Sequence, residues 1–143
     1  MPQKETLHKS ERLCSKKAIE SLFAGGSKST ASFPFRAVYK EAENSYTPLR
    51  IMISIPKHRL HHATDRNRMK RLVREAYRRE KPELYERLHK SSLYIDVAFI
   101  CISDKVADYP TVRKSIRKIL QKISEFTDKI LENRPSDTND TIL

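Results

Sequence analysis

Residues 65–79 carry two periodic patterns on one segment, and together these patterns constrain the fold more than any other feature of the chain. Apolar residues recur at the i, i+3, i+4, i+7, i+8 spacing of a buried helix face: Met69, Leu72, Val73, Ala76 and Tyr77. Between positions 66 and 79 there are seven basic residues and one acid, Glu75. The segment therefore predicts a helix that packs against a core with one face and carries a cationic array on the other.

The polar side of this predicted helix supplies the candidate binding residues: Arg66, Asn67, Arg68, Lys70, Arg71, Arg74 and Arg78. Like charges four residues apart on a helix repel each other, so we expect a polyanion to neutralise the array. The guanidinium fork suits phosphate oxygens, and a helix N-terminus favours anions. Asn67 carries no charge and would bond a phosphate, a sugar hydroxyl or a base edge, or brace the preceding loop. The alternative is a solvated charged face, which the one-sided imbalance disfavours.

The charge of the whole chain agrees with an anionic partner. The chain has 143 residues, with 29 basic and 18 acidic side chains and a formal net charge of +11. Such an excess favours attraction to nucleic acid or to an anionic membrane surface. No run of about 18 apolar residues predicts a membrane span, and the first residues lack the apolar core of a secretory signal. We expect a cytoplasmic protein with no membrane partner.

The remaining patterns predict a single α/β domain with the element order α-β-β-α-β-α. The expected elements are a helix over 16–24, strands over 33–40 and 49–55, the basic helix, a strand over 93–102 and a long helix from 108. Residues 27–32 are expected to form a turn, Thr64 or Asp65 to cap the basic helix, and Pro82 to end or kink it. The nearly unbroken apolar run over 93–102 is typical of a central strand.

We expect this domain to cover residues 13–131. Residues 1–12 are polar and are expected to be flexible. Residues 132–143 are rich in Asn, Asp, Thr and Pro and are expected to form a disordered tail.

The segment Arg66-Asn67-Arg68, followed by Lys70-Arg71-Leu72 and Arg74, resembles the signature of the bacterial ribonuclease P protein subunit. The order of the other expected elements agrees with that family over about residues 11 to 124. The chain departs from the family before the motif, where it has His61-His62 and many members carry a glycine. This difference concerns the conformation of the loop.

The resemblance implies a domain of the ribosomal-protein-S5-domain-2-like group with a βαβ crossover. It implies a ribonucleoprotein endonuclease that removes the 5′ leader of precursor tRNA. The RNA subunit, using bound Mg²⁺, would perform the hydrolysis. The protein would bind the catalytic RNA and the leader, with no catalytic side chain, no cofactor of its own and no further protein partner.

Two sets of site residues follow. The set expected to bind the catalytic RNA is Arg66, Asn67, Arg68, Lys70, Arg71, Arg74 and Arg78 with Lys57 and Arg59 of the preceding loop. The set expected to line a leader-binding cleft between the first helix and the sheet is Ile19, Phe23, Phe35, Tyr39, Lys16, Lys17 and Arg36. Tyr39 is favoured over Phe35 as the strand aromatic. The alternative for Ile19 and Phe23 is ordinary core packing.

Two other functions are compatible with the charge pattern. A ribosomal or DNA-binding protein could use the basic helix in a groove. A self-sufficient metal-dependent nuclease would need side chains that converge on an ion. The adjacent His61 and His62 lack the i, i+4 spacing that directs two rings at one metal, and with two glycines the chain has no Gly-rich phosphate loop. We therefore expect no metal site in the protein.

Overall fold

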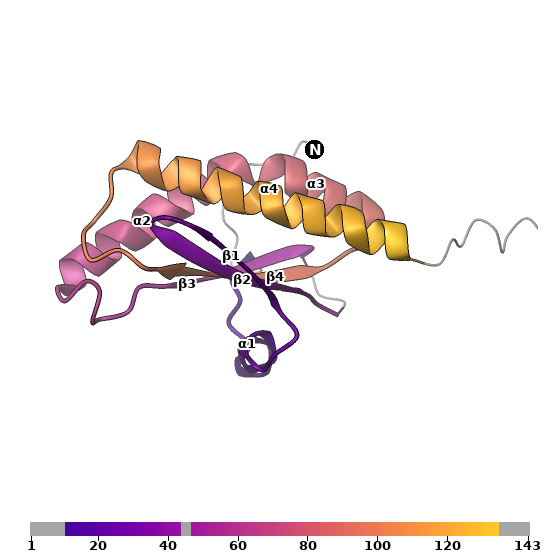
Figure 1. Cartoon of the computed structure of the whole chain (residues 1–143), viewed down its shortest axis with the longest axis horizontal. Helices are drawn as coiled ribbons and strands as arrows, with labels where there is room; N and C mark the ends of the chain where they lie inside the picture. The colour runs from indigo at the N-terminus through magenta and orange to yellow at the C-terminus, as the bar shows by residue number, and fades with distance from the viewer. Residues whose placement is uncertain (1–10, 44–46, 135–143) are drawn as a thin grey trace, which may run out of the picture.

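The computed structural model describes residues 11–43 and 47–134, which form an α/β domain with helices on both faces of one sheet (Figure 1). Three helices cover one face: α2 (Ala63–Glu80), α3 (Pro82–Ser91) and α4 (Tyr109–Asn133). The short helix α1 (Lys16–Phe23) lies on the other face. Ser15 caps α1 and Asp108 caps α4, each by accepting a backbone N–H with its side chain.

The sheet has four strands in the order β1-β2-β4-β3. Their bounds are β1 (Lys28–Ser32), β2 (Phe35–Glu41), β3 (Leu49–Ser54) and β4 (Ile95–Cys101). Strands β3 and β4 pair in parallel, and the other neighbours are antiparallel. The segment from β3 through α2 and α3 to β4 is therefore the expected βαβ unit. The apolar strand β4 lies in the interior of the sheet, as its sequence predicts.

The expected order of elements lacks one strand, β1, and one helix, α3. Residues 28–32, assigned to a turn, form the edge strand β1. This strand pairs on one side only and contains no large apolar residue, so no period-two apolar pattern marks it. Phe33, expected at the start of the next strand, is 68% exposed in the connection that follows β1.

The basic helix differs from the expectation at its N-terminal end, and it ends close to Pro82 as expected. It begins at Ala63 with His62 as the N-cap residue, so neither Thr64 nor Asp65 caps it. It ends at Glu80, and a second helix starts at Pro82, whose missing N–H is tolerated at a first helical position. Pro82 therefore separates two helices, and the observed order is α-β-β-β-α-α-β-α.

The boundaries of the domain are wider than predicted. Glu11 is fully buried, and the N–H of Leu13 donates to the carbonyl of Ile51 at 2.7 Å. Arg12, beside them, forms a parallel bridge with the same strand residue. At the other end α4 continues to Asn133, beyond the expected limit at 131. The rest of the two expected flexible segments lies outside the described residues.

The sheet separates two apolar clusters. The larger lies under α2, α3 and α4, where the ring of Tyr39 meets Phe126 edge-on at 5.2 Å and that of Tyr77 meets Phe99 at 6.2 Å. The smaller lies under α1 and contains Leu13, Leu22, Val38 and Ala98. None of the described helices is long and apolar enough to cross a lipid bilayer.

Candidate nucleic-acid interface

Helix α2 is oriented by its apolar stripe. Met69, Val73, Ala76 and Tyr77 are completely buried against the sheet and α4, while Leu72 is partly buried beside them. The opposite side of the helix is consequently turned to solvent, and its exposed members include Asn67, Arg68, Arg71 and Arg74. The amphipathic helix predicted from the spacing is confirmed.

Three arginines of α2 have partners within the protein. Glu75 binds Arg78 at 2.6 Å and Arg79 at 3.0 Å, and these hydrogen bonds lower the pKa of the Glu75 carboxyl. Nη1 of Arg66 donates to the carbonyls of Leu60 at 2.9 Å and His61 at 2.8 Å. Arg66 thus holds the loop before α2. Arg78, assigned to the RNA-binding set by helix geometry alone, is instead offset by a carboxylate.

Four cations of the same helix remain unpaired. Among the residues that the structure describes, no hydrogen bond or ion pair involves the side chain of Arg68, Lys70, Arg71 or Arg74. We call these four residues the unpaired cationic face of α2. Their charges lie within two helical turns and repel each other unless an anion lies across them.

A fifth cation reaches this face from the N-terminal segment. Arg12 lines a shallow groove of about 230 Å³ together with Lys70 and Arg74, beside strand β3. The bridge between Arg12 and Ile51 brings it there. Arg12 was absent from the predicted binding residues. The prediction used the spacing of residues 65–79, which contains no information about a contact with residue 12.

The loop before α2 adds less charge than expected. Lys57 is exposed and has no ion pair with the described residues. Arg59 pairs with Asp104 at 3.3 Å, and both side chains are in contact with solvent. An exposed pair of this kind is weak and can exchange for a phosphate.

The predicted leader cleft is only partly assembled around α1. Ile19 is partly buried and packs on the smaller apolar cluster, as its alternative interpretation foresaw, whereas Phe23 at the end of the helix is 48% exposed. Lys16 and Lys17 are exposed on the same helix. Arg36 is exposed on β2, where its Nε donates to Ser29 Oγ at 3.1 Å.

Phe35 and Tyr39 do not belong to this cleft. Both are buried in the larger cluster, on the face of the sheet opposite to α1. Successive strand residues point to opposite faces, so the residue of β2 that packs under α1 is Val38. Burial, and secondarily the charge of Glu125, raise the pKa of the Tyr39 hydroxyl. The alternation of residues along β2 shows which side chains share a face of the sheet. It does not show which of the two faces α1 covers.

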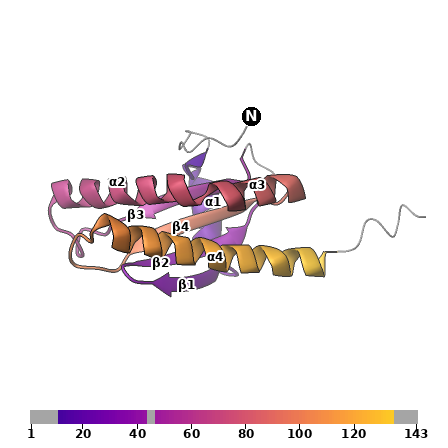
Figure 2. The same ribbon diagram turned by 90° about the horizontal axis from the view of Figure 1, so that it is seen from above.

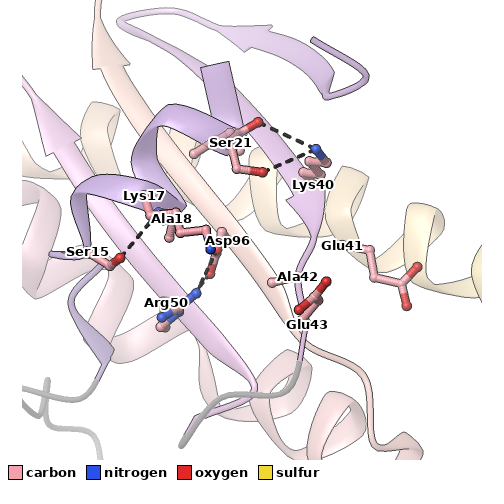
Figure 3. A pocket seen from close by; sticks show the side chains of 11 residues that line it. Ser15, Lys17, Ala18, Ser21, Lys40, Glu41, Ala42, Glu43, Arg50 and Asp96 are labelled. Atoms are coloured by element: carbon pink, nitrogen blue, oxygen red, sulfur yellow. Dashed lines mark hydrogen bonds and ion pairs between the residues drawn. The ribbon is translucent and has the colours of Figure 1, made fainter. Parts of the chain in front are cut away.

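A cavity of about 470 Å³ lies between α1 and the ends of β2, β3 and β4. Figure 3 shows polar contacts on its walls, besides the Ser15 cap of α1. Arg50 donates to both carboxylate oxygens of Asp96, at 2.8 and 2.9 Å. Nζ of Lys40 lies 3.4 Å from Ser21 Oγ. Lys17 also lines the cavity, as do Glu41 and Glu43, so its walls carry charges of both signs.

No group of three or more His, Cys, Asp or Glu side chains within the described ranges could hold a metal ion. His61 and His62 are both exposed in the loop before α2.

Comparison with known proteins agrees with this arrangement. The family model described as Ribonuclease P matches residues 7–124. The chain belongs to the ribonuclease P protein family. A "Ribonuclease P protein component" of Porphyromonas gingivalis is 38% identical over 119 residues, which cover 82% of this chain and 86% of that relative. Another from Chlorobium phaeobacteroides is 26% identical over 134 residues and covers 85% and 92% of the two chains.

Solved structures of ribonuclease P proteins share the fold. The protein from Staphylococcus aureus has a TM-score of 0.59 at 22% identity and covers 81% of this chain and 96% of its own. The protein from Thermotoga maritima has a TM-score of 0.58 at 24% identity and covers 78% and 96%. The resemblance seen in Arg66-Asn67-Arg68 is thus confirmed for family and fold. The ribosomal or DNA-binding alternative is not supported.

Proposed function

We propose that this ribonuclease P protein binds the catalytic RNA through the unpaired cationic face of α2, within an assembly that removes the 5′ leader of precursor tRNA. The observation that carries the proposal is the separation of paired from unpaired arginines on one helix. Glu75 binds Arg78 and Arg79, while Arg68, Arg71 and Arg74 are left to solvent. A charge array that the fold leaves uncompensated is suited to a phosphate backbone.

In this proposal the RNA subunit performs the hydrolysis. Guanidinium groups stay protonated in proteins, so the arginines of α2 can neutralise phosphates but cannot abstract a proton from water. Mg²⁺ held by the RNA would supply the activated water. The protein contributes positive charge that offsets the repulsion between the catalytic RNA and its substrate. The repulsion arises because the catalytic RNA and precursor tRNA are both polyanions. The assembly is expected in the cytoplasm.

The size of the electrostatic contribution can be stated. If Arg68, Lys70, Arg71 and Arg74 neutralise four phosphates of a helical region, affinity should fall about a hundredfold between roughly 50 and 200 mM salt. Asn67, exposed beside them on the first turns of α2, would add a hydrogen bond without charge. Arg66 would act by holding the loop rather than by facing the RNA.

The leader is proposed to run along α1. Phe23 offers a half-exposed ring, and Lys16, Lys17 and Arg36 offer positive charge on the same side of the sheet. One ring and several cations suit an extended single strand, because stacking and backbone attraction tolerate most base sequences.

Reconstitution of the full-length protein with a ribonuclease P RNA tests the proposal. We expect the double variant Arg68→Ala/Arg71→Ala to cleave precursor tRNA at least tenfold more slowly at low Mg²⁺, and excess Mg²⁺ to restore most of the rate. Arg79→Ala is the matched control, because this exposed arginine of the same helix is paired with Glu75. Normal cleavage by the double variant at low Mg²⁺ would remove α2 from the interface. Cleavage by the protein without RNA would refute catalysis by the RNA.

A further inference from the structure

A groove of about 700 Å³ lies between the edge strand β1 and helix α4. Its β1 side is formed by Thr30, Ala31 and the following Phe33, and its α4 side carries three lysines and one carboxylate, that of Glu125. In the view of Figure 2, β1 lies beyond α4 on the side away from α2. The sheet order likewise puts β1 and β3 at opposite edges. This groove is therefore separate from the unpaired cationic face of α2.

The lysines of the groove form one row. Lys114, Lys118 and Lys122 are exposed and follow each other at four-residue steps. Each step advances about 6 Å along a helix, which is comparable with the spacing of successive phosphates in an extended strand. All three lysines line the groove, so several anionic groups of one chain could contact the row at once.

The row is also largely uncompensated. Arg113 and Arg117, on the neighbouring side of α4, are bound by Glu80 of α2 at 2.6 and 3.1 Å. Within the described ranges Lys114 and Lys118 make no ion pair. Lys122 has a long, exposed contact of 3.7 Å with Glu125. The fold thus pairs the arginines on the α2 side of α4 with a carboxylate and leaves Lys114 and Lys118 on the β1 side without an ion pair among the described residues.

An aromatic ring lies beside this row. Phe33 is 68% exposed, and within the described residues the other large apolar side chain classed as exposed is Phe23. The end of β1 is fixed on α4 by a hydrogen bond from Ser115 Oγ to the carbonyl of Ser32. The backbone that carries Phe33 is consequently held beside α4.

We propose that this groove binds a single-stranded segment of RNA, with phosphates on Lys114 and Lys118 and a base stacked on Phe33. A positive row with an adjacent ring is the usual composition of such a surface. An acidic peptide added to the edge of β1 fits less well. Peptide addition obtains its specificity from pockets for alternate side chains, and β1 presents only small and polar residues.

Binding of fluorescein-labelled U10 RNA to the full-length protein, followed by fluorescence anisotropy and by amide NMR shifts, tests the proposal. We expect U10 to shift the amides of residues 30–33 and 111–122. Phe33→Ala should weaken binding about tenfold, as loss of one stacked base predicts, and Phe33→Tyr should restore it. Lys114→Ala/Lys118→Ala should weaken it and reduce the salt dependence.

Lys105→Ala/Lys129→Ala is the control of equal charge, because both side chains are exposed outside the groove. Shifts confined to α1 and α2, or variants that bind like this control, would overturn the proposal. If a poly-glutamate peptide displaced labelled U10 as well as unlabelled U10 does, the groove would select for negative charge alone. That result would also overturn the proposal. The result is independent of the α2 interface, because Arg68→Ala/Arg71→Ala protein should still show the groove shifts.

Discussion

The carboxylate of Glu11 contacts the ammonium group of Lys81, and both side chains are completely removed from solvent. The pair joins the N-terminal segment to the junction between α2 and α3. The ammonium group also lies 5.8 Å and 5.3 Å from the ring centroids of Tyr77 and Tyr85. Burial, and next the charge of Glu11, raise the pKa of both tyrosine hydroxyls. Because Arg12 follows Glu11 directly, the pair helps to hold Arg12 beside Lys70 and Arg74.

Removing one member of this pair should destabilise the protein strongly. Glu11→Ala leaves the Lys81 ammonium group buried without its carboxylate, a defect that costs about 3–5 kcal/mol. Urea denaturation of the variant measures the loss. The double variant Glu11→Leu/Lys81→Met should recover most of it, since an apolar pair avoids the desolvation cost. The exposed pair of Glu86 and Lys90, at 3.7 Å, supplies the control. Glu86→Ala should change the stability by less than about 0.5 kcal/mol.

The paired and unpaired arginines of α2 should differ in the salt dependence of RNA binding. Arg71→Ala removes one exposed charge and should lower the slope of log K against log salt by about 1. Arg78→Ala removes a charge that Glu75 already offsets and should leave the slope nearly unchanged. Filter binding of the catalytic RNA at several salt concentrations measures both slopes. Equal slopes for the two variants would contradict the division of the helix into paired and unpaired charges.

Glu80 should make stability depend on acid pH. The hydrogen bond from Arg117 lowers the pKa of this carboxyl, burial opposes it, and the hydrogen bond from Arg113 lowers it further. Because the pKa of this carboxyl is lower in the folded state than in the unfolded state, the carboxylate stabilises the fold at pH values above the unfolded-state pKa, near 4.5. This contribution is lost as the pH falls through the folded-state pKa. Glu80→Gln should therefore lose stability at pH 7 and show a flatter decline below pH 4.5. Urea midpoints across this range test it, and parallel curves for the variant and the native protein would contradict it.

The sequence predicted those parts of the fold in which periodicity and burial coincide. The apolar and cationic faces of α2 lie where the spacing predicts them. Strand β4, in which Asp96 is the one charged residue, lies in the interior of the sheet as its apolar run predicts. Strand β1 escaped prediction because an edge strand of small and polar residues has no apolar pattern. The assignment of Tyr39 to the cleft failed because the packing of α1, not the strand period, decides which face becomes the cleft.

Contacts distant in sequence were equally beyond reach. The pair of Glu11 and Lys81 spans 70 residues, and the bond from Arg59 to Asp104 spans 45. The sequence around either residue of such a pair does not identify its partner. The partners of the α2 arginines, by contrast, are local: Glu75 binds Arg78 and Arg79, and Arg66 donates to carbonyls of the preceding loop. A count of charges does not separate these paired arginines from the exposed ones.

Phe23 should distinguish precursor tRNA from mature tRNA. It is the aromatic residue of α1, and Val38 occupies the strand position beneath that helix, so a second ring from β2 does not support it. If a leader base stacks on Phe23, Phe23→Ala should weaken precursor binding to the reconstituted holoenzyme about tenfold. Affinity for mature tRNA, which lacks the leader, should stay unchanged. Glu20→Ala, an exposed change on the same helix, is the control. An equal loss of affinity for both RNAs would mean that Phe23 supports the fold of α1 instead of contacting the leader.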